Sequence, residues 1–380
     1  MKVKWGISFI FALVILVFLT FRSYKNKVYD WDMPGYIGCL FSSEYPDFPQ
    51  KVHHFTYRSM KKEAPDLQFK DIIGLDKVSP GKAKNFFYKN TEAFTEQIAY
   101  YKLKIGYNFL ISILYKAGLS APMSILWISI ISYFFSGLLL FYIFNILFPE
   151  NYFLPPIFTF LVLVLPPVSH MSTTPSPDML TFLFLLIFAA ALLKKCNYWI
   201  IFSMLLLLIL IRPDYIVFAL SYFATAIIFN YFSIKKFDFL YLCQAFILLA
   251  LYIFIVKYYE YPGWKEVFYD TFIERRPLIS AKAADFRVRE YFEVLFIKLI
   301  NFKKITLVSL SLVGLIFYFS KDMWIRVYSA FLFLNIYIKF LFFPASSDTR
   351  FFIGFIVLLF VMFLYSLSKK YNGFKLRKIA

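Results

Sequence analysis

Cysteine, histidine and acidic residues are all scarce in this chain of 380 residues, and each shortage excludes a class of protein. The three cysteines stand far apart, so they form neither a disulfide framework nor a paired-cysteine metal site. The three histidines lack the HxH or HExxH spacing that marks common metal sites. The 23 acidic residues are outnumbered by 41 basic ones, which gives a formal net charge of +18. In a soluble protein this excess would favour a nucleic-acid partner.

Apolar residues are abundant instead: 61% of the chain is hydrophobic, 51 residues are phenylalanine and the mean hydropathy is +0.66. A soluble domain cannot remove that much apolar surface from water. Several runs of about 17–20 residues carry almost no charge, which is the length that a helix needs to cross about 30 Å of hydrocarbon. The sequence therefore predicts an all-α integral membrane protein. Its basic residues then belong to cytoplasmic loops and to contacts with anionic headgroups of the lipid bilayer, and no nucleic-acid partner is expected.

Ten segments are apolar and long enough to predict transmembrane helices. They cover about residues 5–21, 122–148, 153–168, 178–194, 198–212, 215–232, 237–257, 304–320, 323–343 and 351–368. No small-x-small cleavage site follows the first segment, so we expect it to remain as an uncleaved helix. Lysines collect in the short connections on one side of this arrangement and in the C-terminal tail. The positive-inside rule then predicts cytoplasmic N- and C-termini for a multi-pass protein of the inner cell membrane.

Two long polar segments, 22–106 and 258–303, are predicted to lie on the extracytoplasmic side as loops of a single membrane domain, 1–380. They contain 17 of the 23 acidic residues, so the acidic chemistry of the protein is expected to face outward. Residues 98–118, at the end of the first loop, are apolar at helical spacing but carry lysines. This pattern predicts an amphipathic helix in the membrane interface; a second spanning helix is the alternative interpretation.

Two aspartates follow the first apolar segment closely. The chain there reads Tyr29-Asp30-Trp31-Asp32-Met33-Pro34-Gly35-Tyr36. Two carboxylates at this spacing can supply a general base and a hydrogen-bonding or metal-binding partner. An unperturbed aspartate has a pKa of about 3.9, so it is ionised at neutral pH and can accept a proton. Asp30 and Asp32 are therefore candidate catalytic residues; alternatively, the two acids solvate the end of a helix.

Three short motifs with charged residues stand at the ends of later apolar segments. They are Ser176-Pro177-Asp178-Met179-Leu180, Arg212-Pro213 and Asp348-Thr349-Arg350-Phe351. With Asp32, Tyr36 and the predicted interfacial helix, this order resembles the GT-C superfamily of polytopic glycosyltransferases, which includes the protein O-mannosyltransferases and the aminoarabinose transferases of lipid A. Members have a first helix, a long external loop that opens with an acidic residue and a tyrosine, interfacial amphipathic helices and many further spans. Many members have adjacent acids where this chain has Asp-Trp-Asp, and the spacing to Tyr36 favours Asp32 as the base.

The resemblance implies an inverting hexosyl or pentosyl transferase that uses a polyprenyl-phosphate-linked sugar on the extracytoplasmic face. The acceptor would be a glycan, a lipid or a protein. In such a reaction a base removes the acceptor proton, and cations neutralise the phosphate of the leaving group. Arginine suits phosphate because its planar guanidinium donates two parallel hydrogen bonds. The outer-face candidates are Arg212, Arg275, Arg276, Arg287, Arg289 and Arg350.

Arg212 and Arg350 are favoured for substrate binding because they terminate apolar segments at headgroup depth; snorkelling to the interface is the alternative. The stretch Glu274-Arg275-Arg276-Pro277 is interpreted as a solvated loop in preference to a phosphate site. Tyr36, His54 and Asp178 are further candidates for contacts with the substrate. A divalent metal cation is the one cofactor that the histidines and Asp178 could hold, and no spacing motif supports it.

A transporter or flippase of a lipid-linked or anionic substrate is the alternative function. A transporter is expected to have repeated halves, with charged or Gly- and Pro-broken positions at mid-membrane. Here the charges stand at the ends of apolar segments, no internal repeat is found and the chain has only 12 glycines. A polymerase or ligase of the O-antigen type would be expected to carry its large loop late in the chain, whereas the largest loop here is the first. The sequence therefore favours a membrane glycosyltransferase with an aspartate base.

Overall fold

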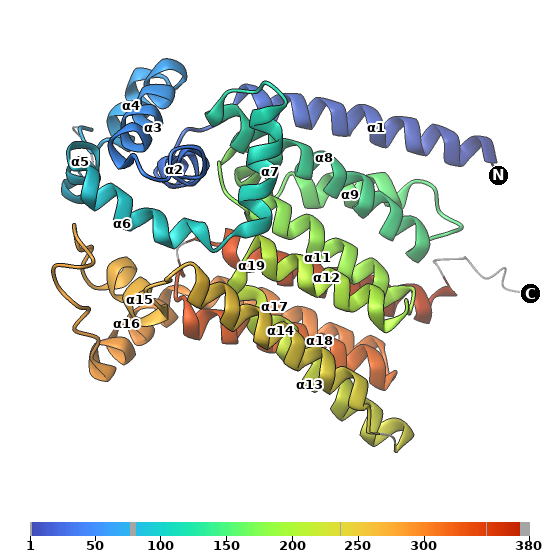
Figure 1. Ribbon diagram of the computed structural model, residues 1–380. Coiled ribbons are helices and arrows are strands. Elements are labelled where there is room, and N and C mark those ends of the chain that lie inside the picture. The colour runs from blue at the N-terminus through green and yellow to red at the C-terminus, as the bar shows by residue number, and fades with distance from the viewer. Residues whose placement is uncertain (1, 77–80, 236, 347, 373–380) are drawn as a thin grey trace, which may run out of the picture.

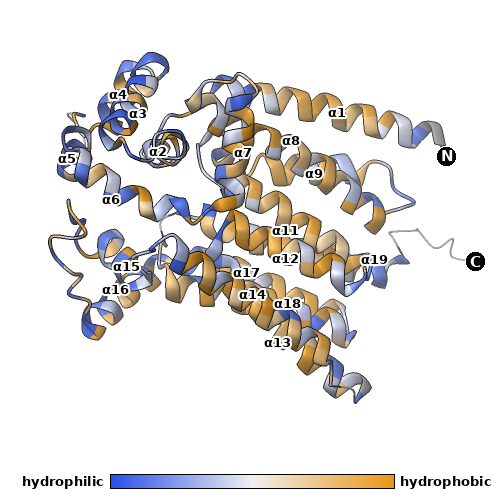
Figure 2. Ribbon diagram, viewed as in Figure 1, coloured by the Kyte–Doolittle hydropathy of each residue, from blue (hydrophilic) through white to orange (hydrophobic). Residues whose placement is uncertain are grey.

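The computed structural model describes residues 2–76, 81–235, 237–346 and 348–372, and within them every regular element is a helix (Figure 1). Most of these helices pack into a bundle whose residues are predominantly apolar (Figure 2). The bundle helices are α1 (Lys2–Lys25), α8 (Ala121–Leu147), α9 (Leu154–Leu163), α10 (Pro166–Thr173), α11 (Asp178–Leu193), α12 (Tyr198–Ile211), α13 (Ile216–Ile234), α14 (Phe239–Tyr258), α17 (Lys303–Phe319), α18 (Met323–Phe342) and α19 (Arg350–Lys370). A 3₁₀ turn, η1 (Pro213–Tyr215), leads into α13.

Six helices among the described residues are long and apolar enough to cross a membrane, and the number rises to eight if each of two bent helix pairs forms one span. The six are α1, α8, α13 together with η1, α14, α18 and α19. The apolar helices α11 and α12 have only 16 and 14 residues. By length and composition the chain is a multi-pass α-helical membrane protein. Helices cover each of the ten predicted segments, whereas the count of ten spans stays a prediction.

The two bent pairs show where the chain departs from straight helices. α9 and α10 meet at an angle of 66°. Leu165 between them is not helical, with a ψ of 129°, because a residue that precedes a proline avoids the helical conformation. The span predicted over 153–168 is therefore divided between α9 and the start of α10, and its crossing of the membrane stays a prediction. The second pair, α16 (Val288–Asn301) and α17, is bent by 67°.

The two predicted loops fold into short helices that gather at one end of the bundle (Figure 1). The first loop and the residues after it contain α2 (Met33–Glu44), α3 (Pro49–Glu63), α4 (Asp66–Ile72), α5 (Lys82–Lys89), α6 (Thr91–Lys102) and α7 (Ile105–Lys116); the second contains α15 (Trp264–Phe272) and α16. Figure 1 places them at the opposite end from the start of α1 and the end of α19. Both loops therefore share one end of the bundle, while the membrane side that they face stays a prediction.

The prediction of one continuous helix over 98–118 is wrong. The structure divides this segment into α6 and α7 at Leu103 and Lys104. Lys104 has backbone angles of φ −83° and ψ 61°, outside the helical region. Its ammonium group donates a hydrogen bond to the hydroxyl of Tyr36, 2.5 Å away. The break thus turns a lysine inward from an otherwise apolar segment.

The loop helices have an apolar core of their own, in which α2 packs closely on α6. A Cβ atom on Gly35 would overlap the ring of Tyr101, and one on Gly38 would lie 2.8 Å from Phe94. Met33 and other residues of α2 are buried in this core. Burying one large apolar side chain contributes about 1.5–3 kcal/mol, so a core of this size holds the loop helices in a defined position. The glycines let the start of α2 approach α6, which positions the aspartate that precedes α2.

Candidate functional site

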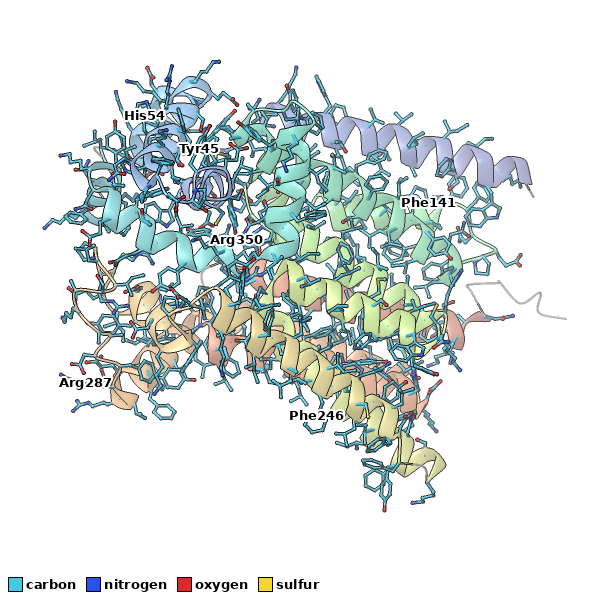
Figure 3. All side chains as sticks on the ribbon, in the orientation of Figure 1. Tyr45, His54, Phe141, Phe246, Arg287 and Arg350 are labelled. Carbon is cyan, nitrogen blue, oxygen red and sulfur yellow. The ribbon has the colours of Figure 1, made fainter. Side chains whose placement is uncertain are left out.

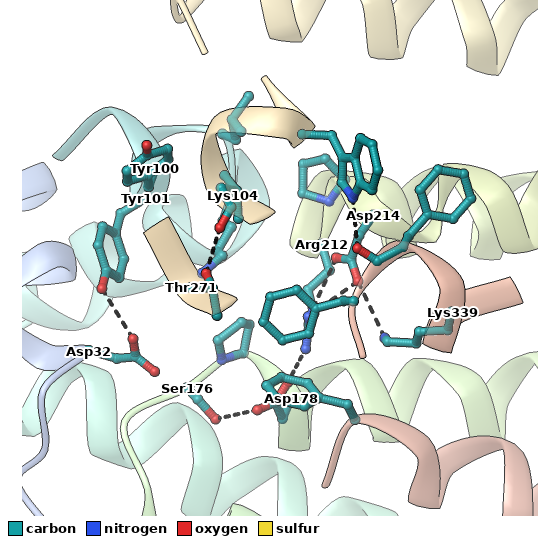
Figure 4. A pocket seen from close by; sticks show the side chains of 18 of the residues that line it. Asp32, Tyr100, Tyr101, Lys104, Ser176, Asp178, Arg212, Asp214, Thr271 and Lys339 are labelled. Atoms are coloured by element: carbon teal, nitrogen blue, oxygen red, sulfur yellow. Dashed lines mark hydrogen bonds and ion pairs between the residues drawn. The ribbon is translucent and has the colours of Figure 1, made fainter. Parts of the chain in front are cut away.

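A cavity of about 950 Å³ lies where the loop helices meet the ends of the bundle helices. It draws its walls from segments far apart in the sequence, as the close view in Figure 4 shows. Its basic lining residues are Lys82, Lys84, Lys104, Arg212, Arg275, Lys339 and Arg350; its acidic ones are Asp32, Asp178, Asp214 and Asp270. The excess of basic residues makes the cavity suited to an anionic ligand.

Asp32 stands at the N-terminus of α2 and lines the cavity (Figure 4). The hydroxyl of Tyr101 donates a hydrogen bond to its Oδ1 at 3.1 Å. Its other oxygen, Oδ2, accepts no hydrogen bond from the residues that the structure describes. Asp32 therefore presents an oriented carboxylate with one oxygen free to receive a proton.

Asp30 lies behind Asp32 and is not among the residues that line the cavity. Its Oδ1 accepts a hydrogen bond from the backbone N–H of Asp32 at 3.0 Å. Burial and the neighbouring charge of Asp32 raise the pKa of Asp30 to about 8. Asp30 therefore keeps a proton more readily than an exposed aspartate does. The two predicted catalytic residues thus occupy different environments, with Asp32 at the cavity and Asp30 supporting it.

Tyr36 and Lys104 form a hydrogen-bonded pair in the wall of the cavity. The Lys104 ammonium lies 2.5 Å from the Tyr36 hydroxyl and 5.1 Å from the centre of the Tyr101 ring. Burial lowers the pKa of Lys104, although the charge of Asp32 opposes this effect. Within the described ranges no carboxylate oxygen lies within 4.0 Å of Lys104. The cavity therefore contains a buried amine that has an aromatic hydroxyl rather than an acid as its partner.

Three charged residues from the ends of three bundle helices meet at the floor of the cavity. Asp178 begins α11, Arg212 follows α12 and Arg350 begins α19. Arg212 forms an ion pair with Asp178, and Arg350 Nε lies 3.6 Å from the other oxygen of Asp178. The side chain of Asp178 is only 5% exposed. A buried carboxylate between two arginines orients both guanidinium groups toward the cavity.

Outer carboxylates complete this ion-pair network. Arg212 Nε lies 3.1 Å from Asp214, and Arg350 Nε lies 2.7 Å from Asp348. The ammonium of Lys339 lies 3.3 Å from Asp214. Sequence reasoning missed Lys339 and Lys104. The signal that could have found them is a lysine inside or between apolar helices, where a charge is expensive unless it is paired or used.

The remaining predicted residue, His54, does not join this cluster. It is exposed on α3, far from Arg350 in the view of Figure 3, and it is absent from the cavity wall. Arg287 and Arg289 are also exposed and do not line the cavity. In the part of the chain that the structure describes, no group of three or more His, Cys, Asp or Glu side chains is placed to hold a metal ion. The site therefore consists of Asp32, Tyr36 and the Asp178 network.

The second loop covers the cavity from the other side. Tyr100 of α6 donates a hydrogen bond to Asp270 of α15 at 2.6 Å. Arg276 lies 2.7 Å from Asp270 and 2.5 Å from Glu266, and its side chain is 3% exposed. Because a buried arginine needs several acceptors, these bonds fix the end of α15 against α6. The interpretation as a solvated loop is therefore wrong for Arg276.

No protein-family model matches this chain, and neither a curated protein nor a solved structure is significantly similar to it. The class of protein is therefore defined by the fold and the cavity alone. It is a multi-pass α-helical membrane protein with a polar, cation-rich cavity at one end of its apolar bundle. Such a cavity can combine proton transfer by a carboxylate with binding of an anion.

Proposed function

We propose that this protein is a glycosyltransferase that moves a sugar from a polyprenyl-phosphate carrier to an acceptor on the extracytoplasmic face of the inner membrane. The observation that carries the proposal is one cavity in which a carboxylate with a free oxygen, Asp32, faces the arginines at the bundle ends. A base and a cationic site for a phosphate are the two groups that this transfer requires.

The proposed reaction uses each group at a defined atom. The acceptor hydroxyl attacks the anomeric carbon, and Asp32 takes its proton on the free carboxylate oxygen. The new carbon–oxygen bond forms while the bond from the anomeric carbon to the phosphate oxygen breaks. The electron pair remains on the lipid phosphate, whose negative charge increases. Cations at the site where charge develops lower the barrier, which is the role proposed for Arg212 and Arg350.

The position of the cavity suits a lipid-linked donor. It lies at the ends of apolar helices, and large apolar side chains such as Phe246 and Phe254 are exposed on the outer face of α14. A long apolar chain is most stable in the hydrocarbon of the bilayer, whereas a charged headgroup is most stable in a polar environment. A donor of this type can therefore keep its chain in the membrane while its phosphate and sugar enter the cavity.

Asp32→Asn tests the proposal. Purified full-length protein in lipid nanodiscs is incubated with a panel of polyprenyl-phosphate sugars and hydroxyl acceptors, and release of polyprenyl phosphate is measured. We expect the variant to lose at least about 100-fold in rate, the usual contribution of a general base. Asp47→Asn, an exposed aspartate of the same loop, is the matched control and should keep the wild-type rate.

Two outcomes would contradict the proposal. One is transfer by Asp32→Asn at the wild-type rate. The other is uptake of a lipid-linked or anionic substrate into sealed proteoliposomes without any sugar transfer, which would identify the protein as a transporter. The bound sugar and the acceptor that support turnover in the panel would name the substrates.

A further inference from the structure

We propose that Arg275, which lines the cavity, binds an acidic group of the acceptor, and that the acceptor is an acidic saccharide. The role of this subsite as an acceptor site rests on the proposed transferase function, but its capacity to bind an acidic saccharide does not. The proposal follows from four features: the surroundings of Arg275, its missing counter-charge, its position beside Asp32 and the aromatic walls of the cavity.

Arg275 is held in place by aromatic rings rather than by acids. Its guanidinium carbon lies 5.8 Å from the ring centre of Trp31, 5.6 Å from that of Phe87 and 5.7 Å from that of Tyr100. One nitrogen donates a hydrogen bond to the amide oxygen of Gln97. Contacts with three rings restrict the arginine to one orientation, and the ring faces attract its positive charge. The side chain is thus preorganised without being neutralised.

The charge of Arg275 has no counter-charge in the described residues. No carboxylate oxygen there lies within 4.0 Å of its nitrogens, and its buried Nε has no hydrogen-bond partner. The next residue differs completely, because Arg276 is paired with both Glu266 and Asp270. Two adjacent arginines therefore have different roles: Arg276 fixes the second loop, whereas Arg275 keeps its donors for a ligand. An anion in the cavity would supply the counter-charge that the described residues do not give to Arg275.

The position of Arg275 places such an anion beside the proposed base. Trp31, which lies against Arg275, directly precedes Asp32 in the chain. Tyr100, another ring in contact with Arg275, directly precedes Tyr101, whose hydroxyl donates a hydrogen bond to Asp32. Trp31 and Tyr100 thus contact Arg275, while the residues that follow them are the proposed base and its hydrogen-bond donor. An acceptor anchored by its acidic group at Arg275 would present a nearby hydroxyl to Asp32.

The walls of the cavity favour a saccharide over an acidic peptide. Its tryptophan and tyrosine lining residues are Trp31, Tyr36, Tyr100, Tyr101, Tyr215, Tyr252, Tyr261 and Trp264. Such side chains offer apolar faces for the C–H groups of a sugar ring and polar edges for its hydroxyls. Lys82 also lines the cavity and extends the attraction for an acidic ligand, whereas Lys84 is paired with Asp71 at 2.8 Å.

The test measures binding of defined probes to full-length protein in nanodiscs by calorimetry. The charged saccharide probes are hexagalacturonate, which carries carboxylates, and glucose 6-phosphate, which carries a phosphate; maltohexaose is neutral, and a Glu-Ser repeat peptide represents the acidic peptide. We expect the wild-type protein to bind a charged saccharide in preference to maltohexaose and to the peptide. Arg275→Gln should weaken that binding about ten- to a hundredfold, as expected for a lost charge-assisted hydrogen bond. The probe with the larger loss tells whether the acidic group is a carboxylate or a phosphate.

Arg289→Gln is the matched control, because Arg289 belongs to the same loop and its side chain is 89% exposed. It should bind the probes as the wild type does, and the thermal midpoint of ligand-free Arg275→Gln should equal that of the wild type. The subsite is refuted if Arg275→Gln binds the charged saccharides as tightly as the wild type, if the wild type prefers maltohexaose, if the peptide binds best, or if no probe binds.

Asp32→Asn, measured in parallel, separates this inference from the proposed function. The variant lacks the proposed base but retains Arg275 and its ring contacts, so it should bind the charged saccharides like the wild type. If binding depends on Arg275 and yet no protein transfers sugar, the subsite stands and the transferase proposal fails. If transfer depends on Asp32 while Arg275→Gln binds the charged saccharides normally, the transferase proposal stands and the Arg275 subsite is refuted.

Discussion

Replacing Asp178 with asparagine should destabilise the folded protein by about 3 kcal/mol, because this substitution removes one negative charge from between two buried arginines. The side chains of Asp178, Arg212 and Arg350 are 5%, 13% and 16% exposed. Breaking a buried ion pair by removing one partner costs about 3–5 kcal/mol. The lower end applies here because each arginine keeps a second carboxylate, Asp214 or Asp348.

The assay is the free energy of unfolding in detergent micelles, obtained from a denaturant titration followed by tryptophan fluorescence. Asp322→Asn is the control, since Asp322 is an aspartate that pairs with only one cation, Lys369, at 2.8 Å. That pair is 37% and 47% exposed, so its loss should cost only about 0–1 kcal/mol and should diminish further in high salt. A double-mutant cycle with Arg212→Gln should give a coupling energy of about 1–3 kcal/mol between the two positions. The reasoning fails if Asp178→Asn costs no more than Asp322→Asn.

Two further predictions concern Asp30 and Gly35, which lie on either side of the start of α2. Because the pKa of Asp30 is about 8 in the folded protein and 3.8 in the unfolded chain, its stabilisation is fully present below the unfolded value and is lost as the pH rises through about 8. Asp30→Asn should therefore reduce the fall in unfolding free energy between about pH 5 and pH 9, and an unchanged pH dependence would contradict the assignment. Gly35→Ala should displace the Tyr101 ring, weaken its hydrogen bond to Asp32 and cost about 1–3 kcal/mol of stability. Gly314→Ala, where a Cβ atom meets nothing within 4 Å, should not destabilise the protein, since alanine favours a helix more than glycine does, and it should leave transfer activity unchanged.

Most of the helices could be predicted from the sequence, because a helix that crosses a bilayer must satisfy its backbone within itself and cover that backbone with apolar side chains. Both requirements are local and leave a visible pattern. The breaks were predicted less well. The helix break before Pro166 is marked by the proline itself, but a search for long apolar runs does not detect it. The helix break at Lys104 depends on the contact with Tyr36, a residue 68 positions away in the chain.

The candidate site was predicted in part. Asp32, Asp178, Arg212 and Arg350 each stand at the end of an apolar helix, and the structure brings them to one cavity. The choice of His54 rested on residue type alone, and the structure leaves that side chain exposed and outside the cavity. Residue type shows what a side chain can do chemically, but burial and neighbours decide whether it takes part.

The all-helical membrane class, the two polar loops and the charged residues at the helix ends could be read from the amino-acid order, because all of these depend on the transfer of single side chains from water to lipid. Only the tertiary structure decided which charges meet. It separated Asp32 at the cavity from Asp30 behind it and Arg275 without a counter-charge from the paired Arg276. Residues of the same type that are close in the sequence differ here in their charged partners and in their burial. Electrostatic energy depends on both, and segments far apart in the chain supply the partners and cover the side chains.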